Sequence, residues 1–594
     1  MQRLKRITAP QFFFFLRDLT SSFLTLDDSI KRRFIFSFFL VIITISLNIV
    51  SPLLLKQLVG NFSLSLKENR SILFILGFSY GFSWGMSQII MQLREIISFK
   101  IVERIIRILT LKIFDKANSF SVKYFVHHQL GDVLSTINTA QEGVPYLFSG
   151  VFLYLIPTII EIIIACTIMA TLLPLKFTAI FLIMLVTYVA FSMWGINKST
   201  AHQEKSIDKN HEAYSYLVDR LINYETIKIF CKQQFESEQL DLHLRESEEA
   251  QVKASIFIES VRLGQGAILG ISLLFLILAG VWAVIDHEIR LEGFILVNAY
   301  FMQLCAPLNY FSLIVKDIKK GFMNIGKAYD ILNKKSESYK KSGKLVSKLN
   351  LRKIELKNVT FGYQEERPTL EDLSFCLEKG KVTSLVGKTG SGKSTIAKLL
   401  LRFYDPFFGT ILVDGNNYED HHMDTIRQNI GYVPQDPVLF CNTIYYNLTY
   451  GNPNASVQEI KVALEKADLN HFVANLPNGL DTFIGERGVS LSGGEKQRLA
   501  LARIFLTKKK LYIFDEATSA LDSKTQKLIQ NHILSLKKDA AVLIISHRLA
   551  SVVDSDEILV LSEGQIIERG NHSFLLSLNK NYASLWKGSI AKSL

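Results

Sequence analysis

The chain has 594 residues, too many for one hydrophobic core, so two or three domains are expected. Hydrophobic residues make up 48% of it and charged residues 21%, a balance that excludes an ordinary soluble enzyme and indicates membrane spans. The net charge of +12 comes without a basic recognition motif, so we expect no nucleic-acid partner and assign the excess Lys and Arg to cytoplasmic loops of a membrane protein.

Residues 1–32 are predicted to form an amphipathic segment on the cytoplasmic membrane surface. Three basic residues within the first six positions precede a short aromatic run, Phe12–Leu16, which is followed by Arg17 and Asp18. The run is too short for the core of a signal peptide, and no small-residue cleavage site follows it. A basic segment with one apolar patch is typical of a helix that lies in the membrane interface.

Residues 33–320 contain six runs that are long enough to cross a bilayer, whose core needs about 20 apolar residues per helix. The third run, Gly143–Leu175, contains one acid, Glu161, and its Pro174 predicts a tight turn into the next helix. An ionisable group within a span suggests a function, although a helix-packing hydrogen bond explains Glu161 equally well. The five uncharged runs are Phe34–Leu55, Ser71–Leu93, Phe177–Asn197, Leu263–Ile285 and Gly293–Val315.

The charges between these runs predict the orientation of the chain. Arg94–Gln141 is long and rich in Lys and Arg, and Lys198–Arg262 is also long and charged, whereas connections on the opposite side, such as Asp286–Glu292, are short. The positive-inside rule therefore puts both termini in the cytoplasm. The two long segments show helical periodicity, so we expect the spans to continue into the cytoplasm as helices. The absence of an Arg- and Ser-rich, acid-poor leader favours a bacterial inner membrane over an organelle.

Residues 321–350 are predicted to form a polar, Lys- and Ser-rich linker. From residue 351 to residue 594, short β-branched runs alternate with helical ones, which predicts a soluble α/β domain.

A glycine-rich loop follows the predicted strand Lys381–Val386 and precedes the predicted helix Ser394–Arg402, which is the context of a P-loop. Backbone N–H groups of such a loop surround phosphate oxygens, and the helix N-terminus adds a favourable dipole. Lys393 would pair with the β- and γ-phosphates of ATP, and the Ser394 hydroxyl would ligate Mg²⁺. The predicted nucleotide-binding residues of the loop are Gly387, Lys388, Thr389, Gly390, Ser391, Gly392, Lys393, Ser394 and Thr395.

A second apolar strand, Leu511–Asp515, ends in two adjacent carboxylates. Asp515 would hold Mg²⁺, and Glu516 would polarise the water that attacks the phosphate. An Asp-Glu pair at a strand end is common by itself. The P-loop upstream is what makes this pair a strong indication of a nucleotide-hydrolysing site.

Between the two motifs, Leu491–Arg498 opens a helix in which Ser492, Gly493 and Gly494 offer free N–H groups to an anion, or simply cap the helix. This segment resembles the signature sequence of ABC transporter ATPases, with Glu495 where glutamine is commoner in that family.

Other segments resemble the same family in order and spacing. Tyr363 is similar to the aromatic residue that stacks on adenine, Gln435 to the glutamine that contacts Mg²⁺, and Asp522 to the D-loop aspartate. His547 is similar to the histidine that contacts the γ-phosphate, and Gly485–Gly488 resembles an exporter loop that couples the domains. The resemblance implies a catalytic set of Glu516, His547 and Gln435, and an Mg²⁺ set of Ser394, Gln435 and Asp515.

The resemblance covers essentially the whole chain, and it implies an α-helical six-span transmembrane domain followed by an α/β P-loop ABC ATPase domain. In the family, the signature loop of one subunit completes the P-loop site of the other. The chain should therefore act as a homodimer with two ATP sites, a heterodimer being the alternative. ATP hydrolysis would switch the transmembrane cavity from facing inward to facing outward.

Several stretches, among them Val218–Lys228 and Asn298–Tyr310, resemble mitochondrial-type and bacterial exporters linked to glutathione, heavy metals and iron–sulfur maturation. This implies export of glutathione derivatives or of metal- and sulfur-linked thiol compounds. Gln265, Asn309 and Arg262 would then contact the substrate, although both amides fit helix packing equally well. Asparagine is typical at position 262, and the inner end of the fourth span near residues 199–204 lacks arginines that would attract an anionic tripeptide.

Two other functions remain open at this point. A lipid or multidrug flippase would have the same fold, and an ATP-gated channel or regulator would use the nucleotide domain as a switch. Intact Glu516 and His547 argue against the channel, because a gate need not hydrolyse ATP. The expected partners are a second copy, membrane lipids and a small-molecule substrate.

Overall fold

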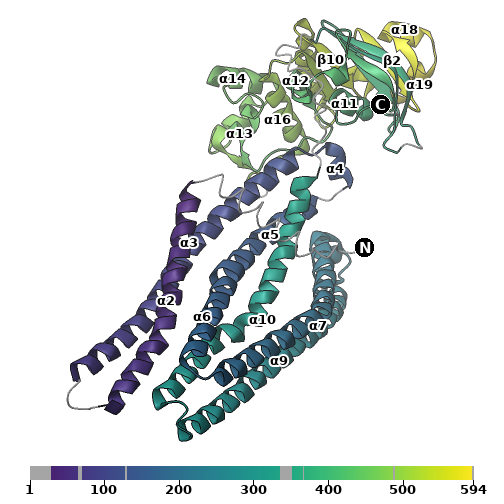
Figure 1. Cartoon of the computed structure of the whole chain (residues 1–594). Helices are drawn as coiled ribbons and strands as arrows, with labels where there is room; N and C mark the ends of the chain where they lie inside the picture. Colours follow the sequence, from purple (N-terminus) through teal and green to yellow (C-terminus); the bar gives the residue numbers. More distant parts are fainter. Residues whose placement is uncertain are drawn as a thin grey trace. The chain divides into compact units, whose positions relative to one another are not determined.

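The computed structural model describes residues 28–64, 70–127, 130–334, 351–364, 367–485 and 488–590 (Figure 1). Residues 1–27 of the predicted amphipathic segment, residues 335–350 of the predicted linker, and Glu486 and Arg487 lie outside these ranges. The chain divides into two compact units, Met1–Asn118 with Gln129–Lys334, and Ser119–His128 with Lys335–Leu594. We call them the membrane unit and the nucleotide unit.

The membrane unit consists of long helices. α3, α7 and α9 have 49, 48 and 53 residues, so each continues well beyond the length of its predicted span, as the periodicity of the charged segments predicted. Pro174 caps the start of α7 and accepts a hydrogen bond from the Phe177 N–H. The elements are α2 (Asp28–Leu64), α3 (Arg70–Asn118), α5 (Leu130–Phe148), the π-helical turn η1 (Ser149–Leu155), α6 (Ile156–Leu172), α7 (Leu175–Ile222), α8 (Tyr224–Ile229), α9 (Gln233–Ile285) and α10 (Leu291–Asn333).

Five stretches of the described residues are helical, long and apolar enough to cross a membrane, and they lie in α2, α5–η1–α6, α7, α9 and α10. The remaining predicted span, Ser71–Leu93, lies within α3 and stays a prediction. α10 continues through the first part of the predicted linker to Asn333, because Ile325, Ala328 and Ile331 maintain a buried stripe at helical spacing.

Small residues allow two helices of the membrane unit to approach closely. A Cβ atom on Gly143 of α5 would lie 3.1 Å from the Gly321 carbonyl oxygen of α10, and a Cβ on Gly321 would lie 2.9 Å from the Gly143 carbonyl oxygen. Small residues at such crossings are what helix packing within a membrane favours. Figure 1 shows α7 and α9 running side by side.

The nucleotide unit is built on two main sheets. The larger sheet has the strand order β12-β11-β3-β10-β9-β6, and β11, β3, β10, β9 and β6 are parallel to one another. Its residues in β9 and β10 are all buried, as expected for parallel strands that are covered on both faces. The strands are β3 (Val382–Gly387), β6 (Ile430–Val433), β9 (Leu511–Asp515), β10 (Ala541–Ile545), β11 (Glu557–Ser562) and β12 (Gln565–Gly570).

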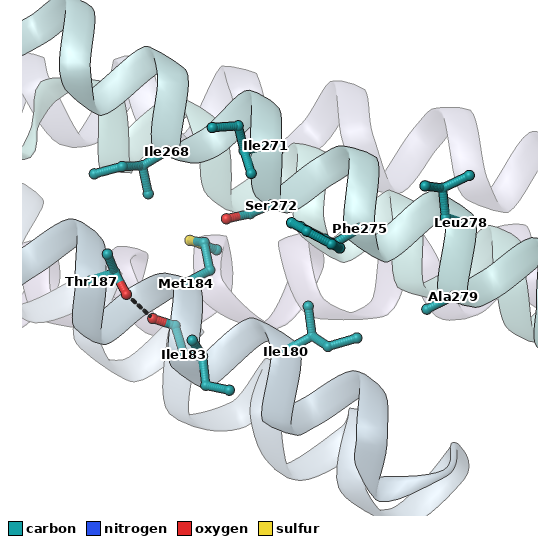
Figure 2. A pocket seen from close by; sticks show the side chains of 10 residues that line it. All are labelled: Ile180, Ile183, Met184, Thr187, Ile268, Ile271, Ser272, Phe275, Leu278 and Ala279. Carbon is teal, nitrogen blue, oxygen red and sulfur yellow. Dashed lines mark hydrogen bonds between the residues drawn. The ribbon is translucent and has the colours of Figure 1, made fainter.

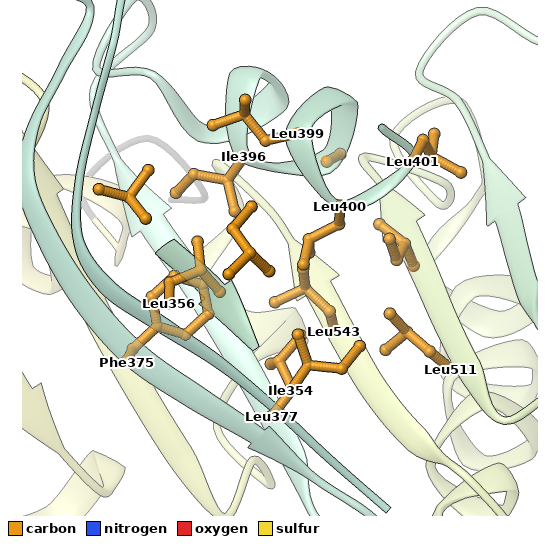
Figure 3. Close-up of a cluster of buried hydrophobic side chains, with 14 of the residues drawn as sticks. Ile354, Leu356, Phe375, Leu377, Ile396, Leu399, Leu400, Leu401, Leu511 and Leu543 are labelled. Atoms are coloured by element: carbon orange, nitrogen blue, oxygen red, sulfur yellow. The ribbon is translucent and has the colours of Figure 1, made fainter. Parts of the chain in front are cut away.

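The smaller sheet is antiparallel, with the order β2-β1-β4-β5, and a short pair β7-β8 lies apart from it. Figure 3 shows the core between this sheet and the larger sheet, where Leu356 and Phe375 face Ile396 of α11 (Lys393–Leu400) and Leu543 of β10. The strands are β1 (Lys353–Phe361), β2 (Leu370–Glu378), β4 (Phe408–Val413), β5 (Asn416–Asn417), β7 (Asn442–Thr443) and β8 (Phe483–Ile484).

Helices complete the nucleotide unit, which also contains the short α4 (Val122–His127) from the segment after α3. They are α11 (Lys393–Leu400), α12 (Met423–Gln428), α13 (Ile444–Thr449), α14 (Val457–Lys466), α15 (Asn470–Ala474), α16 (Gly493–Phe505), α17 (Ser523–Ser535), α18 (His572–Ser577) and α19 (Asn581–Ile590).

Candidate nucleotide site and membrane cavity

The glycine-rich loop joins β3 to α11, as its position in the sequence predicted. Gly390 and Gly392 have φ angles of +85° and +102°, a left-handed region that favours glycine. The Lys393 ammonium donates to the carbonyl oxygens of Gly387 at 2.9 Å and Lys388 at 2.8 Å. Burial lowers the pKa of the Lys393 amine, while the carboxylates of Glu516 and Asp515 act in the opposite direction. The loop therefore holds a buried cation beside two acids.

Asp515 lies at the carboxyl end of β9 and is only 2% exposed. Burial raises the pKa of Asp515, against the opposing effect of a hydrogen bond with the Ser394 side chain. Its Oδ1 atom is buried and has no hydrogen-bond partner among the described residues. A buried, unsatisfied carboxylate oxygen in a native fold needs an explanation, and a cation bound at this atom supplies one.

The order of the central strands brings the three predicted catalytic residues together. Ile545 of β10 is in register with Asp515 of β9, and Val433 of β6 is in register with Phe514. The residues that follow these three parallel strands therefore meet at one edge of the sheet, where ligands of open α/β sheets bind.

Glu516 is at the centre of this edge. Its Oε2 accepts a hydrogen bond from the Gln435 amide at 2.9 Å, and its Oε1 lies 3.0 Å from Nδ1 of His547. Its φ angle is +50°, a left-handed conformation that costs a non-glycine residue about 1–3 kcal/mol. Residues in such strained conformations cluster at functional sites. A carboxylate fixed in this way can orient a water molecule and accept its proton.

Tyr363 presents an aromatic face beside the loop. Its hydroxyl lies 3.4 Å from the Thr395 hydroxyl and accepts a hydrogen bond from Lys398 at 3.3 Å. The rings of Phe361 and Tyr404 pack edgewise against it, yet 43% of Tyr363 remains exposed. Because its hydroxyl is held and one part of its ring is free, the residue can stack on a planar base.

The signature segment forms a complete helix cap. Ser492 is the N-cap of α16, its hydroxyl lies 2.7 Å from Oε2 of Glu495, and it accepts a bond from the Glu495 N–H at 3.3 Å. The helix-cap alternative is thus correct for the local structure, and Glu495 has the role of the acidic residue in a capping box. Among the described residues, no hydrogen bond or ion pair joins residues 492–494 to the P-loop of the same chain.

Sequence reasoning gave no role to Gln497, which the structure places between three of the motifs. Its side-chain amide donates to Oγ of Ser519 at 3.1 Å and to the carbonyl oxygens of Glu516 at 3.2 Å and Gln435 at 3.5 Å. Its Oε1 accepts from the Ala520 N–H at 3.0 Å. The sequence signal that could have identified it is its place on the apolar face of α16, where an amide must find polar partners.

Replacing Gln497 with leucine is expected to lower the rate of ATP hydrolysis about tenfold and to destabilise the nucleotide unit by about 1–3 kcal/mol. The change leaves several buried polar groups unsatisfied and releases the backbone that carries Glu516. Steady-state ATPase assays and thermal unfolding of the full chain measure the two effects. The exposed Gln458 of α14 provides a control, Gln458→Leu, and equal behaviour of the two variants would contradict this role.

A cavity of the membrane unit with many polar lining residues has a volume of about 1140 Å³ and is lined by residues of α2, α3, α5, η1, α6 and α10. Within it, the Asn48 amide donates to Oε1 of Glu161 at 2.8 Å. Glu161 therefore makes a hydrogen bond between packed helices, which was one of the two explanations that the sequence suggested for it. It also lines the cavity.

The three residues that were predicted to contact substrate do not line this cavity. Gln265 is 2% exposed and donates to the hydroxyl of Ser192 at 2.6 Å and to that of Ser312. This supports its reading as a helix-packing amide. Arg262 forms an ion pair with Glu259 at 3.1 Å. The Asn309 side chain is exposed and does not line the cavity.

A second cavity of about 580 Å³ lies between α7 and α9 and is lined almost entirely by apolar side chains, including Met184 and Phe275 (Figure 2). The hydroxyl of Thr187 is bonded to the carbonyl of Ile183 in its own helix. This cavity therefore offers mainly apolar contact.

Two family descriptions match the chain: "ABC transporter transmembrane region" over residues 34–308 and "ABC transporter" over residues 370–519. The mitochondrial iron–sulfur clusters transporter ABCB7 of Oryzias latipes is 33% identical over 87% of this chain and 69% of its own length. Heavy metal tolerance factor 1 of Caenorhabditis elegans is 32% identical over 95% and 71%. A solved bacterial Atm1-family ABC exporter with ATP bound has a TM-score of 0.85 and 29% identity, covering 94% of this chain and 99% of that one.

Proposed function

This chain belongs to the ABC transporter family as an ATP-hydrolysing half-transporter of the Atm1 type, and we propose that it exports glutathione derivatives or metal- and sulfur-linked thiol compounds. The observation that carries the proposal is a polar cavity, large enough for a peptide-sized ligand, in a chain whose relatives are named for iron–sulfur clusters and heavy metals. The chain is an integral, multi-pass membrane protein, and its location in a bacterial inner membrane stays a prediction.

Two copies of the chain would form the working transporter. Each chain has one P-loop and one signature segment, and Ser492 has no hydrogen bond to its own P-loop among the described residues. The signature segment of the second copy would therefore cover the nucleotide held by the first. Two equal ATP sites follow from this symmetry.

The P-loop site has the donors that Mg²⁺ and ATP require. Oδ1 of Asp515, the hydroxyl of Ser394 and the side-chain oxygen of Gln435 would hold Mg²⁺, which neutralises phosphate charge when bound. The described residues contain no group of three or more His, Cys, Asp or Glu side chains that could hold a metal by themselves, so nucleotide phosphates would complete the coordination.

The remaining residues act on the phosphate and on water. Lys393 would move its ammonium from the loop carbonyls to the β- and γ-phosphate oxygens. Glu516 would orient the attacking water and accept its proton, while His547 and Gln435 hold the carboxylate in place. ATP binding would join the two nucleotide units, and hydrolysis would separate them, so that the membrane cavity opens to each side in turn.

A substrate panel tests the proposed class. The full-length protein in lipid nanodiscs is expected to hydrolyse ATP severalfold faster with oxidised glutathione and to be unaffected by lipid A. The apolar groove between α7 and α9 makes a lipid flippase the second candidate. Stimulation by lipid A without a response to oxidised glutathione would favour that candidate and contradict the proposal.

A further inference from the structure

The cavity of the membrane unit contains an arginine whose side chain has no hydrogen-bond or ion-pair partner among the described residues. Arg94 of α3 lines the cavity and is only 4% exposed. Its Nε atom is buried without a hydrogen bond, and no ion pair or hydrogen bond of its guanidinium is found within the described ranges. The guanidinium has five N–H donors, and leaving such donors unused in a buried position is costly.

The position of Arg94 on its helix excludes the usual explanation for an arginine near a membrane surface. A snorkelling side chain extends toward water from an exposed helix face. Arg94 instead lies on the buried face of α3, which also contains Ser87, Ile90, Ser98 and Ile101. The side chain is therefore directed toward the cavity by the fold, and a ligand in the cavity is what can satisfy it.

The nearby acids are engaged with other groups. Glu95 and Glu161 are the carboxylates that act electrostatically on Arg94. Oε1 of Glu95 accepts a hydrogen bond from the Tyr154 hydroxyl at 3.1 Å, and Oε1 of Glu161 accepts from Asn48. Neither forms an ion pair with Arg94, so they lower the cost of the buried cation without using its donors.

We propose that Arg94 binds a carboxylate of the transported substrate in this cavity. This rests on the proposed function and specifies its substrate as a peptide-like zwitterion with at least one free carboxylate. The planar guanidinium matches a carboxylate with two parallel hydrogen bonds. One acid of the lining, Asp317, suits the ammonium of such a molecule, and the amides of Asn298 and Gln303 suit its peptide groups.

The test compares an acid with its ester. Oxidised glutathione and its fully esterified form, which lacks carboxylates, are titrated against the full-length protein in nanodiscs, and ATPase stimulation is expressed relative to each variant's own basal rate. Arg94→Gln is expected to raise the half-maximal concentration of oxidised glutathione about tenfold or more and to leave that of the ester unchanged. Arg94→Lys keeps the positive charge but loses the planar guanidinium that can donate two parallel hydrogen bonds, so it is expected to recover only part of the affinity. Arg107→Gln removes an exposed arginine from the same helix and provides the control.

Each outcome has one meaning. Equal half-maximal concentrations in the wild type and in both Arg94 variants would overturn the inference and leave the proposed function standing. A wild-type protein that responds to neither the acid nor the ester would overturn the proposed substrate class, and the inference with it. If Arg94→Gln does not fold, the comparison of Arg94→Lys with the wild type decides, because a purely structural role would alter the responses to acid and ester alike.

Discussion

Replacing Glu516 with glutamine is expected to lower steady-state ATP hydrolysis by about 10²–10⁴-fold. The amide has nearly the same shape, so the contacts with Gln435 and His547 can largely persist. It cannot accept a proton from water, and this single loss should stop the chemical step. ATP binding is expected to remain, so the variant should accumulate in the ATP-bound, closed state.

The control for this variant is a second glutamate with the same backbone conformation. Glu563, in the turn between β11 and β12, has a φ angle of +48° and is exposed. Glu563→Gln therefore removes the same charge at a comparable left-handed position, and its ATPase rate should match that of the wild type. Full steady-state hydrolysis by Glu516→Gln would show that the base has been assigned to the wrong residue.

Replacing Lys393 with alanine is expected to weaken ATP binding about 100-fold, which corresponds to about 2.7 kcal/mol. The ammonium is held over the loop by the carbonyls of Gly387 and Lys388, where phosphate oxygens would replace those contacts. Its removal deletes a buried positive charge opposite a polyanion. Equilibrium binding of a fluorescent ATP analogue to the full-length protein measures the effect.

Stability separates this effect from unfolding. Burial lowers the pKa of the Lys393 amine, because a positive charge is costly to bury without its ligand. Removing this charge should therefore not reduce the midpoint of thermal unfolding. Lys379→Ala, in the exposed turn before β3, is the control for the loss of one positive charge. Unchanged nucleotide affinity in Lys393→Ala would contradict the assignment of the P-loop.

Sequence alone predicted the chemistry of the nucleotide unit because that chemistry lies in local motifs. The Asp515-Glu516 pair and the P-loop are each contiguous, and the strands and helices around them have clear patterns. The meeting of Glu516 with Gln435 and His547 depends on the order of β10, β9 and β6 in the sheet. Local patterns do not contain this order, and only the family resemblance supplied it.

The membrane unit was harder to predict, because polar side chains there are few and their direction decides their role. Gln265 was a candidate for substrate contact, but its amide meets two hydroxyls of neighbouring helices. Arg94 was counted among the charges that set the orientation, since it is the first basic residue after an apolar run. Whether such a residue faces lipid, water or a cavity depends on the packing of helices that are far apart in the sequence.

The most direct test of the account is uphill transport by the reconstituted protein. Inside-out proteoliposomes that contain the wild-type chain should concentrate radiolabelled oxidised glutathione above its external level when Mg²⁺ and ATP are added. Vesicles with the Glu516→Gln variant, with equal protein content, should not. Uptake that only equilibrates across the membrane, or that the Glu516→Gln variant supports equally, would show that hydrolysis at this site does not drive export of the thiol compound.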